Sequence, residues 1–149
     1  MSKQNISVTT DCVIFCKTGN DRKVLLVLRK SDPYKGKWAL PGGFLEEEET
    51  LEAGAKRELQ EETGLKINNL KQLTAFGTPG RDPRGRTISI PFIGEVASEE
   101  KVKGADDATD ARWFSLDNLP DLAFDHAEIL QLAHEKILFR KKLIKQRDL

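Results

Sequence analysis

The sequence has little cysteine and no long apolar run. Its two cysteines, Cys12 and Cys16, lie in the apolar stretch "CVIFC" without a nearby histidine, so we expect two reduced core thiols rather than a metal or redox pair. No apolar run approaches the roughly 20 residues of a membrane span, and the N-terminal stretch "MSKQNISVTTD" lacks the apolar core of a signal peptide. A cytoplasmic location is therefore the expectation.

The sequence also has no excess of charge of either sign. Lysine plus arginine and aspartate plus glutamate both number 24 among the 149 residues, so the formal net charge is zero. No global field is available to recruit nucleic acid or an anionic membrane, and we expect neither as a partner. The length is that of one ordinary domain, so residues 1–149 are predicted to form a single one.

Apolar runs and turn residues predict a mixed sheet with two helices. The stretch "TGNDR" separates two runs that should form a hairpin, while Thr50 and Gly64 suit the two ends of a helix over residues 51–62. Apolar spacing from Asp125 onward predicts a long second helix, whose basic tail we interpret as solvated. The strands are expected within residues 6–17, 23–30, 37–45, 70–78, 87–96 and 111–116. This order indicates an α/β (α+β) fold, arranged as an α/β/α sandwich with a mixed sheet.

The first predicted helix carries glutamates on its apolar face. At about 100° per residue, Leu51, Ala55 and Leu59 form the stripe that should face the core. Glu58 and Glu62 fall in or beside this stripe, and a third glutamate between them converges on the same side of the last two turns. A helix built only for solubility would carry its acids on the opposite face.

Carboxylates at this spacing repel one another, and more strongly where water is excluded, so a cation should offset the charge. All-oxygen ligands suit Mg²⁺ or Mn²⁺, whereas zinc would usually bring histidine or cysteine, and neither occurs between residues 41 and 65. The alternative is a solvated acidic helix with a lysine four residues after each glutamate, yet within the helix only Glu52 and Lys56 form such a pair. We therefore interpret the cluster as a divalent-cation site.

The same stretch matches a known motif. Gly43, five residues, Glu49, seven residues and then "RELQEETGL" over residues 57–65 spell out the complete Nudix box. The chain resembles the Nudix hydrolases, which cleave a nucleoside diphosphate linked to another moiety, and so many fixed positions make a chance match improbable. The resemblance covers essentially the whole chain and implies the Nudix α/β/α sandwich. Two positions depart from the usual box without being ligand positions: Glu48 replaces glycine and Gly54 replaces alanine.

The resemblance implies roles for individual residues. The candidate catalytic metal ligands, for Mg²⁺ or Mn²⁺, are Glu58, Glu61, Glu62 and the carbonyl of Gly43. Arg57 and Glu49 would form a structural ion pair that ties the helix to the preceding loop. Glu46 would contact the metal ligands without binding the metal itself.

Hydrolysis also benefits from a general base on a loop opposite the helix. The candidates are Glu99, Glu100, Asp106, Asp107 and Asp110. Members of the family often place an acid shortly before a tryptophan-containing strand, which favours the group around Asp107 without selecting one member.

Phosphates are best held by guanidinium groups. The predicted substrate-binding residues are Arg29, at the end of a strand that leads to the box, and Arg81, Arg84 and Arg86 in the loop "PGRDPRGR". The stretches "RDPRGR" and "LAFDHAEIL" resemble the ADP-ribose pyrophosphatase branch of the family and related Nudix-derived regulators of NAD metabolism. The expected substrate is therefore ADP-ribose, cleaved to AMP and ribose 5-phosphate. His126 is expected to make a structural contact, and the aromatic residues that belong to the core or stack on a base are Trp38, Trp113, Phe114 and Phe124.

Two alternatives stay open. A nucleoside triphosphate pyrophosphohydrolase, acting for example on oxidised nucleotides, would carry the same box, because other loops read the rest of the substrate. A non-catalytic ADP-ribose-sensing regulator should carry a DNA-binding domain after the Nudix unit, and only one predicted helix follows Asp125. The intact box acids also favour an enzyme. The resemblance makes a homodimer the expected assembly, with a small nucleotide as its other partner.

Overall fold

The sheet is built around a long N-terminal hairpin. The computed structural model describes residues 3–102 and 110–147, and in it β1 (Ser7–Thr18) pairs antiparallel with β2 (Asp21–Leu28). Gly19 in the connecting turn has a φ of +61°, a left-handed conformation that glycine adopts without steric cost. The hairpin expected around "TGNDR" is confirmed.

A parallel strand gives the sheet its mixed character. β6 (Thr87–Val96) runs parallel to β1, whereas the other strand pairs among the described residues are antiparallel. The strand order is β3-β2-β1-β6-β5, with β4 also paired to β1 and β7 also paired to β2. The bounds of the remaining strands are Trp38–Ala39 for β3, Gly42–Phe44 for β4, Lys71–Gln72 for β5 and Ala111–Ser115 for β7.

The strand expected over residues 70–78 is much shorter than predicted. It is reduced to β5 and an isolated bridge between Phe76 and Ser89. After Gln72, the next residue facing β6 is Leu73, whose N–H donates to the carbonyl of Pro91 at 2.8 Å. Because Pro91 has no N–H to donate in return, the ladder ends there.

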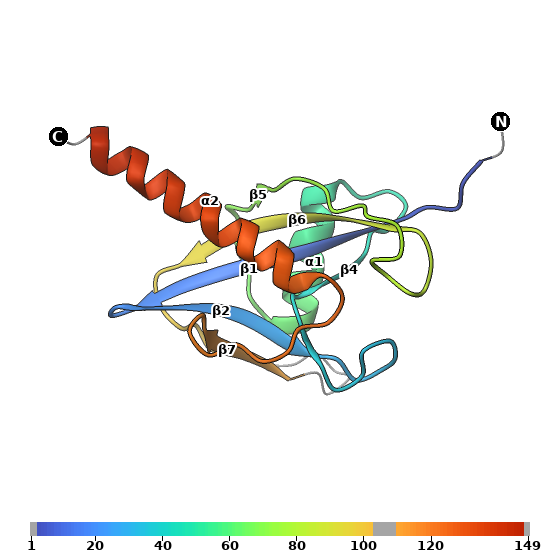
Figure 1. The fold of residues 1–149 in the computed structure, drawn as a ribbon, viewed down its shortest axis with the longest axis horizontal. Helices are drawn as coiled ribbons and strands as arrows, with labels where there is room; N and C mark the ends of the chain where they lie inside the picture. Colours follow the sequence, from blue (N-terminus) through green and yellow to red (C-terminus); the bar gives the residue numbers. More distant parts are fainter. Residues whose placement is uncertain (1–2, 103–109, 148–149) are drawn as a thin grey trace.

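Two helices cover opposite faces of the sheet, α1 (Leu51–Thr63) behind it and α2 (His126–Arg147) in front of it in Figure 1. Successive residues of a strand point to opposite faces, so β1 contributes to two cores. Cys12 and Ile14 pack with Ala55 and Leu59 of α1. On the other face Val13, Phe15, Val24 and Leu26 pack with Ile129, Leu130, Ala133 and Ile137 of α2. The expected α/β/α sandwich with a mixed sheet is confirmed.

The two cysteines are core residues, as predicted. Cys12 and Cys16 are both buried and both free. Burial raises the pKa of each thiol, and Asp11 next to Cys12 and Glu99 near Cys16 act in the same direction. Both thiols therefore stay protonated and unreactive near neutral pH.

The outer half of α2 extends past the sheet (Figure 1). Ile137 is its last buried side chain, and residues 138–147 are exposed, including the basic side chains predicted to be solvated. Nζ of Lys141 lies 3.8 Å from Oε2 of Glu95 on β6. Neither α1 nor α2, as described here, is long and apolar enough to cross a membrane.

Candidate active site

The helix that carries the box has the predicted ends. Thr50 accepts a hydrogen bond from the N–H of Ala53 at 3.1 Å, which caps the first turn. Gly64, with a φ of +79°, ends the helix in the left-handed conformation, and its N–H donates to the carbonyl of Gln60. The helix ends at Thr63, one residue later than expected and directly before Gly64. The Thr63 hydroxyl donates to the Leu59 carbonyl at 2.6 Å.

The glutamates of α1 differ in burial, as the helical wheel predicts. Glu58 and Glu62 lie half-buried beside the core-facing residues. The Glu58 side chain is 15% exposed, whereas that of Glu61 is 58% exposed. Two of the three box carboxylates are therefore held partly out of water.

Burial and a neighbouring carboxylate disfavour the ionised form of Glu62. Its Oε2 accepts a hydrogen bond from the N–H of Gly42 at 3.3 Å. Burial, followed by repulsion from Glu58, raises the pKa of Glu62 to about 8. Burial also raises the pKa of Glu58, although Arg57 opposes this shift. A cation between these carboxylates would relieve the repulsion and favour their ionised forms.

Arg57 ties α1 to the loop that precedes it. Its Nε and Nη2 donate to the two carboxylate oxygens of Glu49 at 2.9 and 2.6 Å, and Nη2 also donates to the carbonyl of Phe44 at 3.2 Å. These hydrogen bonds lower the pKa of Glu49 to about 2. Nη1 donates to Glu58 at 2.9 Å and to Glu61 at 3.2 Å. The geometry matches the predicted structural ion pair, and Arg57 also touches two of the three box acids.

Two glycines of the box allow close contacts. A Cβ at Gly43 would lie 2.7 Å from the carboxyl carbon of Glu58, so a side chain there would displace that carboxylate. A Cβ at Gly54 would lie 2.7 Å from Cδ1 of Leu45 and 3.0 Å from Oε1 of Glu49. The glycine that departs from the usual box therefore provides room for the loop to pack against the helix.

The donor set fits a hard divalent cation. Glu58 and Glu62 are close enough for the charge of one to raise the pKa of the other, and the Glu58 carboxylate lies against Gly43. Oxygen donors of this kind suit Mg²⁺ or Mn²⁺. Within residues 3–102 and 110–147, no three acidic, histidine or cysteine side chains already converge on one point. Arg57 pairs with Glu58 and Glu61, so an ion that recruits both would compete with this arginine.

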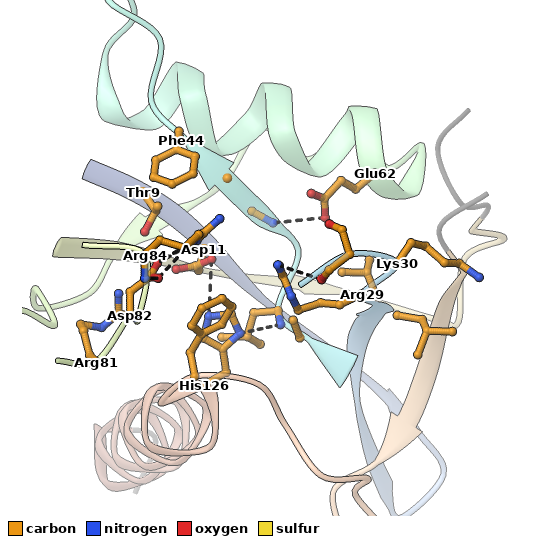
Figure 2. A pocket seen from close by; sticks show the side chains of 18 residues that line it. Thr9, Asp11, Arg29, Lys30, Phe44, Glu62, Arg81, Asp82, Arg84 and His126 are labelled. Carbon is orange, nitrogen blue, oxygen red and sulfur yellow. Dashed lines mark hydrogen bonds and ion pairs between the residues drawn. The ribbon is translucent and has the colours of Figure 1, made fainter. Parts of the chain in front are cut away.

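A pocket with a volume of about 230 Å³ opens beside the box (Figure 2). Its lining combines Gly43 and Glu62 of the box, and the preceding Gly42, with Arg29 and Arg84. The remaining lining residues are Thr9, Asp11, Val27, Leu28, Lys30, Ser31, Ala39, Leu40, Phe44, Arg81, Asp82, Phe124 and His126. One cavity therefore holds a box acid together with three of the four predicted arginines, Arg29, Arg81 and Arg84.

Arg29 and Arg84 approach each other over aromatic rings. The Cζ of Arg84 lies 4.7 Å from the ring centre of Phe44 and 5.4 Å from that of Phe124, and the Cζ of Arg29 lies 5.0 Å from that of Phe124. Burial, and then the nearby charge of Arg84, lowers the pKa of Arg29. Arg29 is partly buried and the Arg84 side chain is 39% exposed, and an anion between these two guanidinium groups would offset their repulsion.

Arg81 and Arg86 have other partners, which the sequence analysis did not foresee. The Arg81 side chain is 4% exposed, and its guanidinium group forms a two-pronged ion pair with Asp125 at 2.9 and 2.6 Å. Arg86 donates to the carbonyl of Gly77 and is not among the residues that line the pocket. Both arginines hold the loop in place, so their geometry favours a structural role over the predicted contact with substrate.

The candidate general bases lie away from this pocket as far as they are described. Oε1 of Glu99 lies 2.8 Å from Nζ of Lys23. The backbone carbonyl of Glu100 accepts a hydrogen bond from Nε1 of Trp113. Oδ2 of Asp110 lies 3.9 Å from Nη2 of Arg112. None of these three acids lines the pocket. Asp106 and Asp107 lie outside the described residues.

The sequence analysis missed two acids that line the pocket. Asp82 is buried and holds Arg84 through hydrogen bonds to Nε and Nη2. Asp11 is buried in β1, where it directly precedes the apolar run over residues 12–16 and breaks the apolar pattern of the strand. That interruption was the available signal, because a charged residue is rarely buried without a partner or a function.

The predicted aromatic and histidine residues divide between core and pocket. Trp38 and Phe114 pack edge to face with ring centres 4.8 Å apart, and Trp113 packs on the α1 side of the sheet. Phe124 lines the pocket. His126 is also buried at the pocket, where its Nδ1 accepts the N–H of Leu40 at 3.0 Å, a structural contact as expected.

Comparison with known proteins assigns this geometry to a family. The chain matches the family described as "NUDIX domain" over residues 8–133. It belongs to the Nudix family. The Nudix box defined above therefore lies in a true Nudix domain, and the fold inferred from the resemblance is the fold of the family.

Individual relatives point toward ADP-ribose. Over 113 residues the chain is 51% identical to an ADP-ribose pyrophosphatase of Methanocaldococcus jannaschii, a match that covers 74% of this chain and 65% of that protein. It is 34% identical to the "ADPR responsive transcriptional repressor NtrR" of Acinetobacter baylyi, over 87% of this chain and 54% of the repressor. The chain thus spans less than two thirds of the length of either relative.

A solved structure shows the same arrangement of elements. The Nudix domain of Shewanella oneidensis NrtR, in a cocrystal structure with ADP-ribose, superposes with a TM-score of 0.85 at 31% identity. The match covers 91% of this chain and 90% of that domain.

Proposed function

We propose that this Nudix protein is a divalent-cation-dependent hydrolase that cleaves ADP-ribose to AMP and ribose 5-phosphate. The observation that carries the proposal is that Glu62 of the box and the guanidinium groups of Arg29 and Arg84 line one pocket. A diphosphate needs both, because its oxygens require positive charge and its hydrolysis requires an activated water. The 51% identity to an ADP-ribose pyrophosphatase supports the choice of substrate.

In this proposal Glu58, Glu61, Glu62 and the Gly43 carbonyl hold Mg²⁺ or Mn²⁺. When bound, the metal neutralises phosphoryl charge and lowers the pKa of a bound water. Arg29 and Arg84 bind phosphate oxygens on the opposite side of the pocket, and the rings of Phe44 and Phe124 contact these guanidinium groups and help to keep them in place. Arg57 fixes the distance between helix and loop.

We further propose that Asp107, or an acid next to it, is the general base. Its segment precedes β7, which pairs with β2, and β2 leads directly to Arg29 in the pocket. A base at this position would approach the diphosphate from a loop rather than from α1, where the carboxylates are committed to the metal. The homodimer expected from the resemblance also remains a proposal, and light scattering after gel filtration measures it.

A second candidate function is an ADP-ribose-sensing regulator. It is favoured by the similarity to a protein named as an ADPR-responsive transcriptional repressor. The intact set of box acids weighs against it, because a sensor that does not turn over its ligand has no need of three carboxylates at ligand spacing. A triphosphate pyrophosphohydrolase remains the alternative within enzymes, since the box acts on phosphate and metal alone.

The test is turnover of ADP-ribose by the purified protein with and without Mg²⁺, with AMP and ribose 5-phosphate as the expected products. Glu62→Gln should remove most of the turnover while leaving the fold intact. Glu48→Gln is the matched control, because Glu48 is an exposed glutamate of the same acidic stretch and makes no contact with the pocket. ADP-ribose binding without cleavage would support the sensor, and near-normal turnover by Glu62→Gln at saturating Mg²⁺ would refute the ligand assignment.

A further inference from the structure

A buried acid forms part of the floor of the pocket. The Asp11 side chain is 8% exposed and lines the cavity from the centre of β1 (Figure 2). The hydroxyl of Ser89, on the adjacent strand β6, donates to its Oδ2. Its Oδ1 lies 3.8 Å from Nε2 of His126 at the start of α2. Three elements thus converge on one carboxylate that the proposed metal and phosphate sites do not use.

His126 presents a hydrogen-bond donor to this carboxylate. Its Nδ1 accepts the N–H of Leu40, which requires a lone pair on Nδ1 and leaves the proton of the neutral ring on Nε2, facing Asp11. Burial lowers the pKa of His126, which favours this neutral form. Ser89 therefore donates a hydrogen bond to Asp11, while the Nε2–H of His126 faces the same carboxyl group from 3.8 Å without forming a hydrogen bond.

Without a metal ion between them, an acceptor at this position is unfavourable beside a phosphate. A carboxylate and a phosphate oxygen repel each other, and the repulsion grows in a pocket that excludes water. The part of a substrate that lies against Asp11 must instead donate hydrogen bonds. In a nucleoside diphosphate sugar, the available donors are the hydroxyls of the sugars and the amino group of the base.

The position of Asp11 relative to the box distinguishes these donors. A Cβ at Gly42 would lie 2.5 Å from Oδ1 of Asp11, and the N–H of the same Gly42 donates to Oε2 of Glu62. Gly42 therefore lies directly between Asp11 and Glu62 of the box. The group bonded directly to a phosphate of the substrate is a ribose, whereas the amino group lies at the far edge of the base.

We propose that Asp11, positioned by Ser89 and His126, is a specificity-determining residue that accepts hydrogen bonds from the hydroxyls of a ribose attached to the cleaved diphosphate. This inference rests on the proposed hydrolysis and adds that the pocket recognises the hydroxyl groups of the ribose. Gly42 is required in this arrangement, because a side chain there would collide with Asp11 and with the Thr10 carbonyl.

The test compares Asp11→Asn with the wild-type protein on matched substrates. The substrates are ADP-ribose, its two analogues with 2-deoxyribose in place of the terminal ribose or of the adenosine ribose, and the analogue with hypoxanthine in place of adenine. Loss of a hydrogen bond to a charged acceptor should lower kcat/KM for ADP-ribose about 10- to 100-fold. The fall should be only about twofold for one of the two deoxyribose analogues, the one that has already lost the hydroxyl in contact with Asp11, and should remain full for the other and for the hypoxanthine analogue. ATP and 2′-deoxy-ATP form a second pair.

Two further variants serve as controls. Ser89→Ala keeps the carboxylate and removes one of its donors, so it should show the same selectivity with a smaller loss, and it replaces Asp11→Asn if that variant does not fold. Asp121→Asn makes the same chemical change at an exposed aspartate and should leave kcat/KM unchanged for every substrate.

Three other outcomes overturn the inference. An equal loss on every substrate would assign Asp11 to the chemistry or to the fold, and an unchanged rate would deny it any role. A loss that disappears with the hypoxanthine analogue would assign Asp11 to the base. If the wild-type protein cleaves triphosphates but not ADP-ribose, the proposed function fails by itself, and the pair of ATP and 2′-deoxy-ATP then decides the role of Asp11.

Discussion

At the scale of single residues, Glu62 links the stability of the protein to its chemistry. Its carboxylate is half-buried beside Glu58, and burial raises its pKa to about 8. Burial beside Glu58 suits the carboxylate to binding a cation. In the metal-free protein the same burial is unfavourable, because the ionised carboxylate is poorly solvated. Functional sites commonly contain groups of this kind.

Glu62 should make the metal-free protein less stable as pH rises. Between the ordinary glutamate pKa of 4.5 and a folded-state pKa of about 8, the carboxyl is protonated when folded and ionised when unfolded. Unfolding then releases a proton, so this contribution to stability is present below pH 4.5 and is lost as pH rises through about 8. The slope is at most about 1.4 kcal/mol per pH unit. Denaturant unfolding in EDTA across this range measures it.

Glu62→Gln should remove this slope, and at pH 8 it should be at least as stable as the metal-free wild-type protein. Glu48→Gln should keep the slope. An identical pH dependence in the wild-type protein and in Glu62→Gln would show that Glu62 is not buried as described.

Arg29 and Arg81 should respond differently to substitution, although the sequence places them in one class. Arg29 donates to the carbonyls of Pro33 and Ser31 and faces the pocket, so Arg29→Ala should lower kcat/KM about 10- to 100-fold with a small change in stability. Arg81→Ala leaves Asp125 as an unpaired, largely buried charge and should cost about 3–5 kcal/mol of unfolding free energy. Kinetics and chemical denaturation of both variants separate the roles, and equal behaviour would reject the distinction.

At the scale of elements, the two helices use different parts of their length. All four turns of α1 contact the sheet or the preceding loop, whereas α2 is buried only as far as Ile137. Neighbouring residues of α2 should therefore differ sharply. Ile137→Ala should cost about 2–4 kcal/mol, because it leaves a cavity in the core. Leu138→Ala, at a position 47% exposed, should change stability by less than about 0.5 kcal/mol. Thermal or urea unfolding measures both, and similar losses would mean that α2 packs in another register.

Most elements could be predicted because their signals are local. The caps Thr50 and Gly64 set the ends of α1, and the apolar runs set β1, β2, β6 and β7. The error at β5 arose because its length depends on Pro91 in another strand. The box acids could be predicted from their own spacing. The partners of Arg81 and Asp11 could not, because they lie 44 and 78 residues away along the chain.

At the scale of the whole molecule, a bound cation should stabilise the fold. In the proposed site, Mg²⁺ would bind the acidic cluster of the folded protein and would find no comparable site in the unfolded chain, so at a concentration 100 times its Kd it should add about 2.7 kcal/mol. Differential scanning fluorimetry with and without Mg²⁺ measures the rise in Tm, and Glu62→Gln should reduce it. Calcium should also raise the Tm. The metal assignment would be wrong if neither ion changed stability or turnover.

The most direct measurement is a competition in which the purified protein, with Mg²⁺, is offered ADP-ribose together with nucleoside triphosphates, including dGTP and 8-oxo-dGTP. Our account predicts that AMP and ribose 5-phosphate form first, with kcat/KM for ADP-ribose at least about tenfold above that for any triphosphate, a transition-state preference of about 1.4 kcal/mol. A triphosphate that outruns ADP-ribose by the same factor would contradict the account and would favour a pyrophosphohydrolase of the nucleotide pool.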